Sequence, residues 1–169
     1  DPTDYICHVP VSMDATCSGL QHLSALTRDP IGAYYTNLVD NGLEQKSDIY
    51  TQVATVADTT KAKLSTRKVR EDGKVTDVVH DLSIEKYWED RPISRNMAKT
   101  PVMTFVYGST LLSTIERISL DMEEAGMPSI TDDQGNVLYS LSALATPIGK
   151  ALRKGVEDTV PEAAIVMKY

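Results

Sequence analysis

The fold of this chain is indicated most clearly by residues 95–108, RNMAKTPVMTFVYG. Distinctive side chains recur at every fourth position of this stretch: Arg95, Lys99, Met103 and Tyr107, with Gly108 following. On an α-helix, residues four apart lie about 40° from one another around the axis, so these side chains follow one face for roughly 18 Å. Ser94 is a good amino-terminal cap and Gly108 a good stop. The stretch therefore predicts a helix with two cations at its start and an aromatic ring at its end.

Such a helix suits a nucleoside triphosphate. The helix dipole favours anions at the amino-terminal end, and an aromatic ring about one nucleotide's length away can stack on a base. The alternative is an amphipathic helix with a basic first turn and a core stripe, which would be the better interpretation of Arg95 and Lys99 alone. Pro101 removes one helical hydrogen bond, so we expect a bend between Met97 and Pro101.

A second motif, HVPVSMDATCSGLQH, occupies residues 8–22. Residues 5–13 have the pattern of a buried strand, Asp14 follows it, and an amphipathic helix opens near Ser18. A carboxylate at the carboxyl end of a strand is where a metal-dependent site in a sheet is expected. The alternative is that Asp14 merely caps the next turn.

The two motifs, in this order, closely resemble the single-subunit DNA-dependent RNA polymerases of bacteriophages and mitochondria. Asp14 matches the first catalytic aspartate of the palm, and residues 95–108 match the fingers helix. Residues 24–29 and 48–50 are also similar to segments of that family, and the resemblance spans about residues 5–115.

The resemblance implies an α+β, mostly helical fragment of a right-hand polymerase, with a palm strand and fingers helices. Residues 1–30 would hold the palm strand and the following helix. Residues 31–91 would form connecting helices with a charged hairpin insertion, and residues 92–169 the fingers helices.

The resemblance also implies DNA-templated RNA synthesis with two Mg²⁺ ions. Asp14 would be catalytic and would bind both ions, and the backbone carbonyl of Ala15 would serve as a further metal ligand, although a family member carries glycine there. Arg95 and Lys99 would clamp the triphosphate. Lys99 would also act catalytically by protonating the leaving pyrophosphate.

Further residues are implied to bind the substrate. Tyr107 would stack near the incoming base or the template and monitor the ribose, and Gly108 would allow close backbone approach. Tyr50 would line the same pocket, with a core aromatic as an equal alternative. Gly19 stands where related DNA polymerases carry a glutamate that blocks the ribose 2′-hydroxyl, so it points to ribonucleotides; Met103, where those enzymes usually carry an aromatic, agrees.

The family's second metal-binding aspartate belongs to a His-Asp pair after the Tyr-Gly helix, and no such pair follows Gly108. The pair His80-Asp81 precedes the helix, so we interpret it as an unrelated part of the charged insertion. We therefore expect this chain alone to be inactive, and its partners to be a DNA template, the RNA product, ribonucleoside triphosphates and the remainder of a polymerase chain.

Composition limits the class of protein. The chain has 169 residues, 41% of them hydrophobic, which is enough for one core. It begins at Asp1 and stops inside a helical pattern, so we expect a fragment. Without a signal peptide or an apolar run of membrane length, we expect a soluble, intracellular protein, in the host cytoplasm if viral or an organelle matrix if mitochondrial. The net charge of −7 gives no support to DNA binding.

Other function classes stay open. A DNA polymerase of the same superfamily is disfavoured by Gly19, whereas a non-catalytic helical interaction module is favoured by the acidic charge and the missing aspartate. A zinc site is disfavoured because Cys7 and His8 are neighbours on a strand and would point to opposite faces. A cysteine hydrolase using Cys17 and His22 lacks any sign of an activated thiolate.

The remaining elements follow from periodicity and turn residues. We expect helices over about 18–27, over about 48–64 with Ile49, Val53 and Val56 on one face, and over 110–125. An Asp29-Pro30 turn should follow the first of these. Residues 65–83 should form a hairpin, and residues 130–139 a turn. The tail from Leu141 should be helical, with breaks near Pro147 and Pro161.

Overall fold

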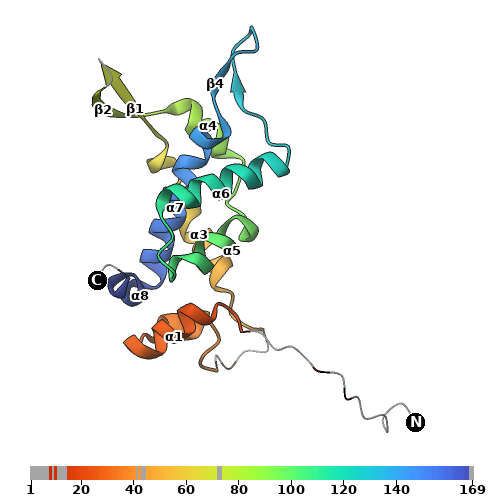
Figure 1. Ribbon diagram of the computed structural model, residues 1–169, viewed down its shortest axis with the longest axis vertical. Coiled ribbons are helices and arrows are strands. Elements are labelled where there is room, and N and C mark those ends of the chain that lie inside the picture. Colours follow the sequence, from red (N-terminus) through yellow and green to blue (C-terminus); the bar gives the residue numbers. More distant parts are fainter. Residues whose placement is uncertain are drawn as a thin grey trace.

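The computed structural model describes His8, Pro10 and residues 15–40, 42, 45–71 and 74–167 (Figure 1). Of the predicted strand over residues 5–13, the structure describes His8 and Pro10, which are not in a strand; the rest of that stretch and the carboxylate of Asp14 lie outside the described residues. The described part of the chain is mostly helical with two small antiparallel hairpins, which confirms the predicted class. No described helix is long and apolar enough to cross a membrane.

The elements follow one another as helices interrupted by the two hairpins. The helices are α1 (Ser18–Thr27), α2 (Pro30–Tyr35), α3 (Ile49–Thr60), the 3₁₀-helix η2 (Ala62–Leu64), α4 (Leu82–Glu89), α5 (Arg95–Phe105), α6 (Leu111–Glu124), α7 (Leu141–Thr159) and α8 (Pro161–Val166). The hairpins pair β1 (Thr66–Glu71) with β2 (Lys74–His80), and β3 (Ile130–Thr131) with β4 (Val137–Tyr139).

Helix α7 forms the centre of the core, because it packs against both α3 and α6 (Figure 1). Its fully buried side chains include Leu144, Ile148 and Leu152. The predicted break near Pro147 is wrong: α7 runs through this residue, whose side chain is buried in the same face. We attribute the continuity to burial of that face, which outweighs one lost hydrogen bond. The predicted break near Pro161 is confirmed, since α8 begins there.

A glycine allows α7 to approach α3 closely. A Cβ atom on Gly155 would lie 2.9 Å from the backbone oxygen of Val53 and 3.2 Å from the Cβ of Ala57. Such distances are too short for a side chain, so the two helix backbones are in contact at Gly155. This contact fixes the position of α3 along α7. It therefore also fixes where the amino-terminal end of α3 lies relative to α7.

Side-chain caps fix the amino-terminal ends of several described helices, and the predicted cap Ser94 is one of them. Ser94 Oγ accepts from the backbone N–H of Met97 at the start of α5, and Thr110 caps α6 in the same way. Asp48 caps α3, which ends at Thr60, and the predicted last turn to Leu64 is the 3₁₀-helix η2. The expected Asp29-Pro30 turn is the start of α2, with Asp29 as its cap.

The face that α3 buries differs slightly from the prediction. Ile49 and Val53 are fully buried, as expected, but Val56 is half-buried and Ala57 takes its place in the core. Pro101 is buried within α5, which is one unbroken helix. Because proline has no N–H, the carbonyl of Met97 lacks its helical donor. The bend between these two residues remains a prediction.

The charged hairpin is present where the sequence predicts it, with Thr66 opposite His80, although residues 82 and 83 belong to α4. Asp81 is buried and caps α4 by accepting from the N–H groups of Ser83 and Ile84. It also accepts from the Tyr139 hydroxyl at 2.6 Å. His80 contacts Glu85 at 2.7 Å. The pair His80-Asp81 thus has a structural role at the base of the hairpin, and its separation from Asp14 remains untested.

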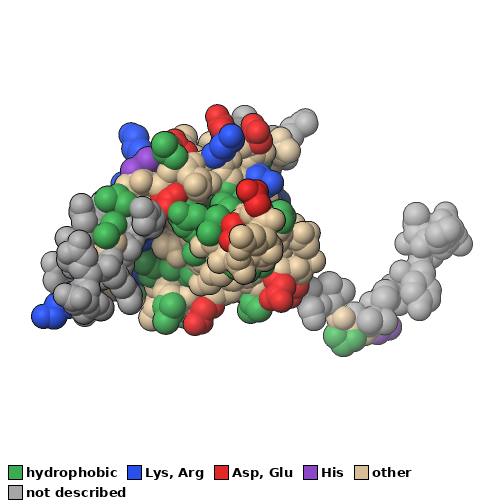
Figure 2. Space-filling view, turned by 90° about the horizontal axis from the view of Figure 1, so that it is seen from above, with side chains coloured by type: hydrophobic (Ala, Val, Ile, Leu, Met, Phe, Trp, Pro, Cys, Tyr) green, Lys and Arg blue, Asp and Glu red, His purple; other side chains and the backbone are tan. Residues whose placement is uncertain are grey.

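Charge is dispersed on the face seen from above. Figure 2 shows acidic and basic side chains interspersed there with hydrophobic ones, rather than one broad basic patch among the coloured residues. This distribution agrees with the acidic net charge of the chain. On the coloured part of this face, attraction for a polyanion would have to come from a local group of cations.

Candidate functional site

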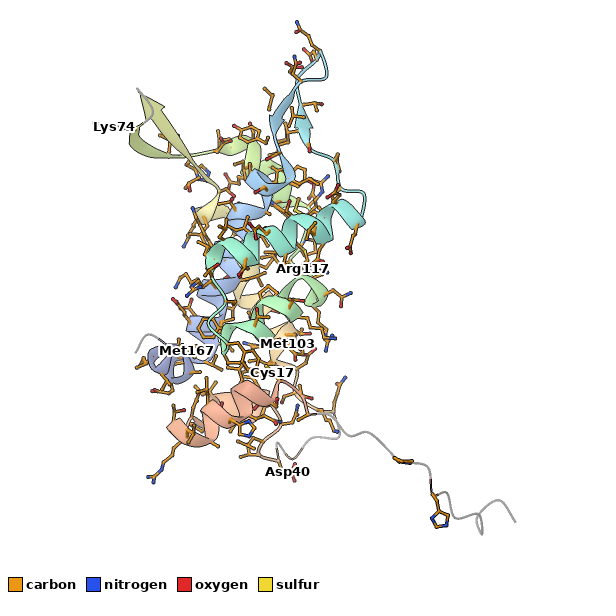
Figure 3. All side chains as sticks on the ribbon, viewed as in Figure 1. Cys17, Asp40, Lys74, Met103, Arg117 and Met167 are labelled. Carbon is orange, nitrogen blue, oxygen red and sulfur yellow. The ribbon has the colours of Figure 1, made fainter. Side chains whose placement is uncertain are left out.

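Most of the described residues singled out from the sequence line one cavity of about 310 Å³. It lies where the segment before α1 and the start of α1 face α3 and one side of α5, and Figure 3 shows Cys17 and Met103 near each other at this junction. The lining residues are Ala15, Thr16, Cys17, Ser18, Gly19, Tyr50, Arg95, Lys99, Met103 and Tyr107. Asp14 lies outside the described residues, and Gly108 is not part of the lining.

A larger cavity of about 500 Å³ lies between α5 and α6. Its lining carries both signs of charge, including Arg117, Asp121 and Glu124, and of the predicted site residues described it contains Lys99 alone. The smaller cavity is therefore the candidate site, because it brings together side chains from three separate parts of the chain that the sequence marked independently.

Helix α5 supplies one wall of the cavity. Arg95, Lys99 and Met103 lie on the helix, but α5 ends at Phe105, so the expectation that Tyr107 belongs to the helix is wrong. Tyr107 lies in the turn that follows, where its N–H donates to Thr104 at 3.0 Å. The turn is tight enough to keep the ring on the same face. Gly108 has a φ of 77°, the left-handed conformation that ends a helix.

Arg95 is held by two contacts from α3. Its Nε donates to Oδ2 of Asp48 at 2.5 Å, and its guanidinium lies over the ring of Tyr50, 5.1 Å from the centroid. Partial burial by itself would raise the pKa of Asp48, but the hydrogen bonds from Arg95, Thr51 and the Tyr50 N–H outweigh it and lower that pKa. From the sequence, Asp48 belongs to the segment 48–50 that is similar to the polymerase family and to the start of the helix predicted over 48–64, with no expected contact to Arg95. The sequence feature that could have indicated this contact is a carboxylate at a helix start, two residues before Tyr50, which was itself expected to line the pocket.

Tyr50 connects α3 to the segment before α1. It is 5% exposed, and its hydroxyl interacts with the thiol of Cys17. Burial, together with the Cys17 thiol, raises the pKa of Tyr50 to about 12. Burial likewise raises the pKa of Cys17. Tyr50 is therefore both a core aromatic and a lining residue of the cavity.

Gly19 touches the turn that carries Tyr107. A Cβ atom on Gly19 would lie 2.3 Å from Cγ2 of Val106 and 3.5 Å from the hydroxyl oxygen of Tyr107. The missing side chain thus has a packing role in this structure. Its proposed role in leaving room for a ribose hydroxyl is a separate prediction.

The cavity's described lining suits an anion better than a metal ion. Arg95 and Lys99 are exposed cations, and Lys99 takes part in no ion pair among the described residues. Within the described part of the chain, no group of three or more His, Cys, Asp or Glu side chains could hold a metal. Two metal ions would need the carboxylate of Asp14 and further carboxylates from outside the described lining of this cavity.

The cysteine-based alternatives lose support. Cys17 is buried with a raised pKa, which is the opposite of an activated thiolate. The Nδ1 of His22 lies 2.7 Å from the backbone oxygen of Ser18, so this ring is engaged within its own helix. Cys7 lies outside the described residues.

Comparisons with known proteins bear on this site. A family model described as DNA-dependent RNA polymerase matches residues 1–169. A DNA-directed RNA polymerase of Pseudomonas phage phiKMV is 35% identical over 170 residues, covering 100% of this chain and 19% of that protein. The mitochondrial enzyme of Neurospora crassa is 35% identical over 146 residues, covering 86% of this chain and 9% of that protein. The mitochondrial enzyme of Mus musculus is 39% identical over 110 residues, covering 65% of this chain and 8% of that protein.

Proposed function

The chain belongs to the DNA-dependent RNA polymerase family, and from this premise we propose that it binds the incoming ribonucleoside triphosphate during DNA-templated RNA synthesis. The observation that carries the proposal is the shared cavity of Arg95, Lys99 and Tyr107 beside the segment that follows Asp14. The chain spans 19% or less of the length of these three relatives. The activity, substrates and partners of a complete polymerase are therefore part of the proposal.

The phosphates would bind at the start of α5. Arg95 and Lys99 are one turn apart near the amino-terminal end, where the N–H groups and the helix dipole add to their positive charge. Lys99 is exposed and lines the cavity, so its ammonium group can reach a phosphate. We propose that Lys99 also donates a proton to the leaving pyrophosphate.

The base and sugar would lie toward the far end of α5. Tyr107 is 76% exposed and Met103 is 41% exposed, which leaves an apolar surface for a stacked base. The Tyr107 hydroxyl lies beside Gly19, so a ribose placed there would meet the hydroxyl and a backbone without a side chain. This arrangement supports a preference for ribonucleotides.

Two Mg²⁺ ions would supply the Lewis acidity for nucleotidyl transfer, as the family resemblance implies. This chain's contribution would be the carboxylate of Asp14 and the carbonyl of Ala15. The other carboxylates would come from the remainder of a polymerase chain, so we propose that this chain alone is inactive. The DNA template and the RNA product are its further partners, in a host cytoplasm or an organelle matrix.

Single-nucleotide extension of a primed DNA template by a complete polymerase that carries this segment tests the proposal. Asp14→Asn should abolish nucleotide addition but leave template binding nearly intact, because it removes negative charge from the metal site. Lys99→Ala should lower kcat and raise KM for the triphosphate. Asp133→Asn and Lys86→Ala, at exposed positions outside the cavity, are the matched controls. Full activity in Asp14→Asn would refute the mechanism.

A further inference from the structure

Asp48 contacts two helices at once. Its Oδ1 accepts from the backbone N–H of Tyr50 at 3.1 Å, which caps α3. Its Oδ2 accepts from the Thr51 hydroxyl at 2.8 Å and from Arg95 Nε at 2.5 Å. The carboxylate is thus fixed by the first turn of α3 before it meets Arg95, which belongs to α5.

The contact through Nε determines how the guanidinium is presented. A guanidinium is planar, and a bond through its Nε edge leaves the N–H donors of both Nη groups for a second anion. The ring of Tyr50 lies under the same guanidinium and is itself buried in the core. Arg95 therefore has one edge and one face fixed, while its side chain remains 48% exposed at the cavity.

We propose that Asp48 is a positioning residue, which holds the Nε edge of Arg95 so that the Nη groups face the phosphates of a ribonucleoside triphosphate. The proposal rests on the proposed function, since it assumes that this cavity receives the triphosphate. It differs from a purely local role for Asp48, because a cap on α3 needs no contact with Arg95. It also differs from simple charge neutralisation, in which Asp48 would compete with the substrate for Arg95.

The variant Asp48→Ser separates these roles. Serine is as good an amino-terminal cap as aspartate, but its short side chain cannot reach Arg95. In a complete polymerase that carries this segment, Asp48→Ser should raise KM for a ribonucleoside triphosphate about three- to tenfold, the loss expected for one ordinary hydrogen bond. The melting temperature and kcat should change little. Asp48→Asn is a second test of the same contact, because asparagine has one acceptor oxygen where aspartate uses two. If that oxygen caps α3, the NH2 group faces Nε and cannot accept from it, so KM should rise here as well.

A double-mutant cycle shows whether the effect passes through Arg95. Arg95→Ala should raise KM on its own, and adding Asp48→Ser to it should raise KM no further. If Arg95→Ala raises KM but Asp48→Ser does not, or if the two effects add, the positioning role is wrong while the proposed function stands. A lower KM in Asp48→Ser would also overturn the positioning role, because it would mean that Asp48 competes with the triphosphate for Arg95. If Arg95→Ala leaves KM unchanged, the phosphate site itself is wrong.

A further variant covers the case in which Asp48→Ser does not fold. Arg95→Lys keeps the positive charge but has no planar fork for Asp48 to orient. We expect KM close to that of Arg95→Ala. A KM near the wild-type value in Arg95→Lys would show that charge alone suffices, and it would overturn the proposal.

Discussion

Gly19 and Val106 are in such close contact that a Cβ atom on Gly19 would lie 2.3 Å from Cγ2 of Val106. The contact joins the first turn of α1 to the turn that carries Tyr107. Two explanations for a glycine at this position therefore coexist, namely clearance for a ribose hydroxyl and packing against Val106. They make different predictions.

Gly19→Ala should destabilise the fold by about 1–3 kcal/mol through overpacking, reduced by the helix propensity gained over glycine. It should also displace Tyr107 and weaken ribonucleotide addition. Val106→Ala removes the clashing methyl groups, so the double variant should recover much of the lost activity if packing is the cause. If the added methyl group blocks the ribose directly, Val106→Ala will not restore ribonucleotide use. Melting temperature and the ratio of ribonucleotide to deoxyribonucleotide addition distinguish the two.

Tyr107→Phe keeps the ring and deletes the hydroxyl beside Gly19. Because the side chain is 76% exposed, the free energy of unfolding should change by less than about 0.5 kcal/mol. Nucleotide addition should continue, with relaxed choice between ribose and deoxyribose. Single-nucleotide extension with both triphosphates provides the measurement, and an unchanged sugar preference would remove the role assigned to this hydroxyl.

The raised pKa of Tyr50 predicts a loss of stability in alkali. A tyrosine titrates near 10 when unfolded, whereas the pKa of Tyr50 in the fold is raised to about 12. Between these values the folded state binds more protons, so the free energy of unfolding falls as pH rises. Urea denaturation at about pH 9 and about pH 11 should show this loss, and Tyr50→Phe should reduce it. The exposed Tyr107, changed to Phe, is the matched control.

Cys17 should react slowly with alkylating agents. Burial raises the pKa of its thiol, and the side chain is 7% exposed. In a Cys7→Ser background, we expect iodoacetamide to modify Cys17 more than about tenfold faster after denaturation than in the folded protein. Equal rates would contradict the burial of this thiol. Tyr50→Phe removes a hydroxyl whose interaction lowers the pKa of the Cys17 thiol, so it should slow the native reaction further.

Local patterns predicted the α5 wall of the site well. The four-residue spacing placed Arg95, Lys99 and Met103 on one face, and the caps Ser94 and Thr110 lie where short-range chemistry favours them. The side chain of Tyr107 also lines the cavity, although its backbone has left the helix. These features depend on neighbours within a few residues, which a single sequence contains.

The contacts between distant segments could not be predicted in the same way. Arg95 pairs with Asp48 across two helices, and Gly19 packs against Val106, because the tertiary fold brings them together. The failed break at Pro147 has the same origin, since burial of α7 overrides a local preference. These contacts depend on tertiary packing, which the periodicity and the turn residues of a single sequence do not specify.

Gly155→Ala should be strongly destabilising for a glycine-to-alanine change in a helix. The new Cβ would lie 2.9 Å from a backbone oxygen of α3, which cannot turn aside as a side chain can. We expect a loss of about 1–3 kcal/mol in the free energy of unfolding, despite the better helix propensity of alanine. Lys154→Ala, the exposed neighbour on α7, is the control and should change stability by less than about 0.5 kcal/mol. Equal losses in the two variants would contradict the close contact.

The contact at Gly155 also affects how genetic screens of this segment should be interpreted. Helix α3 carries Asp48 and Tyr50 to the cavity, and its position depends on a glycine that does not line that cavity. A substitution at Gly155 that still folds would shift α3 and with it the partners of Arg95. Such an allele would be temperature-sensitive and would have a weakened affinity for nucleotide, although the altered residue never meets the nucleotide. A suppressor of it should arise at Ala57, where glycine would remove the Cβ atom that lies 3.2 Å from the position of the new Cβ at residue 155.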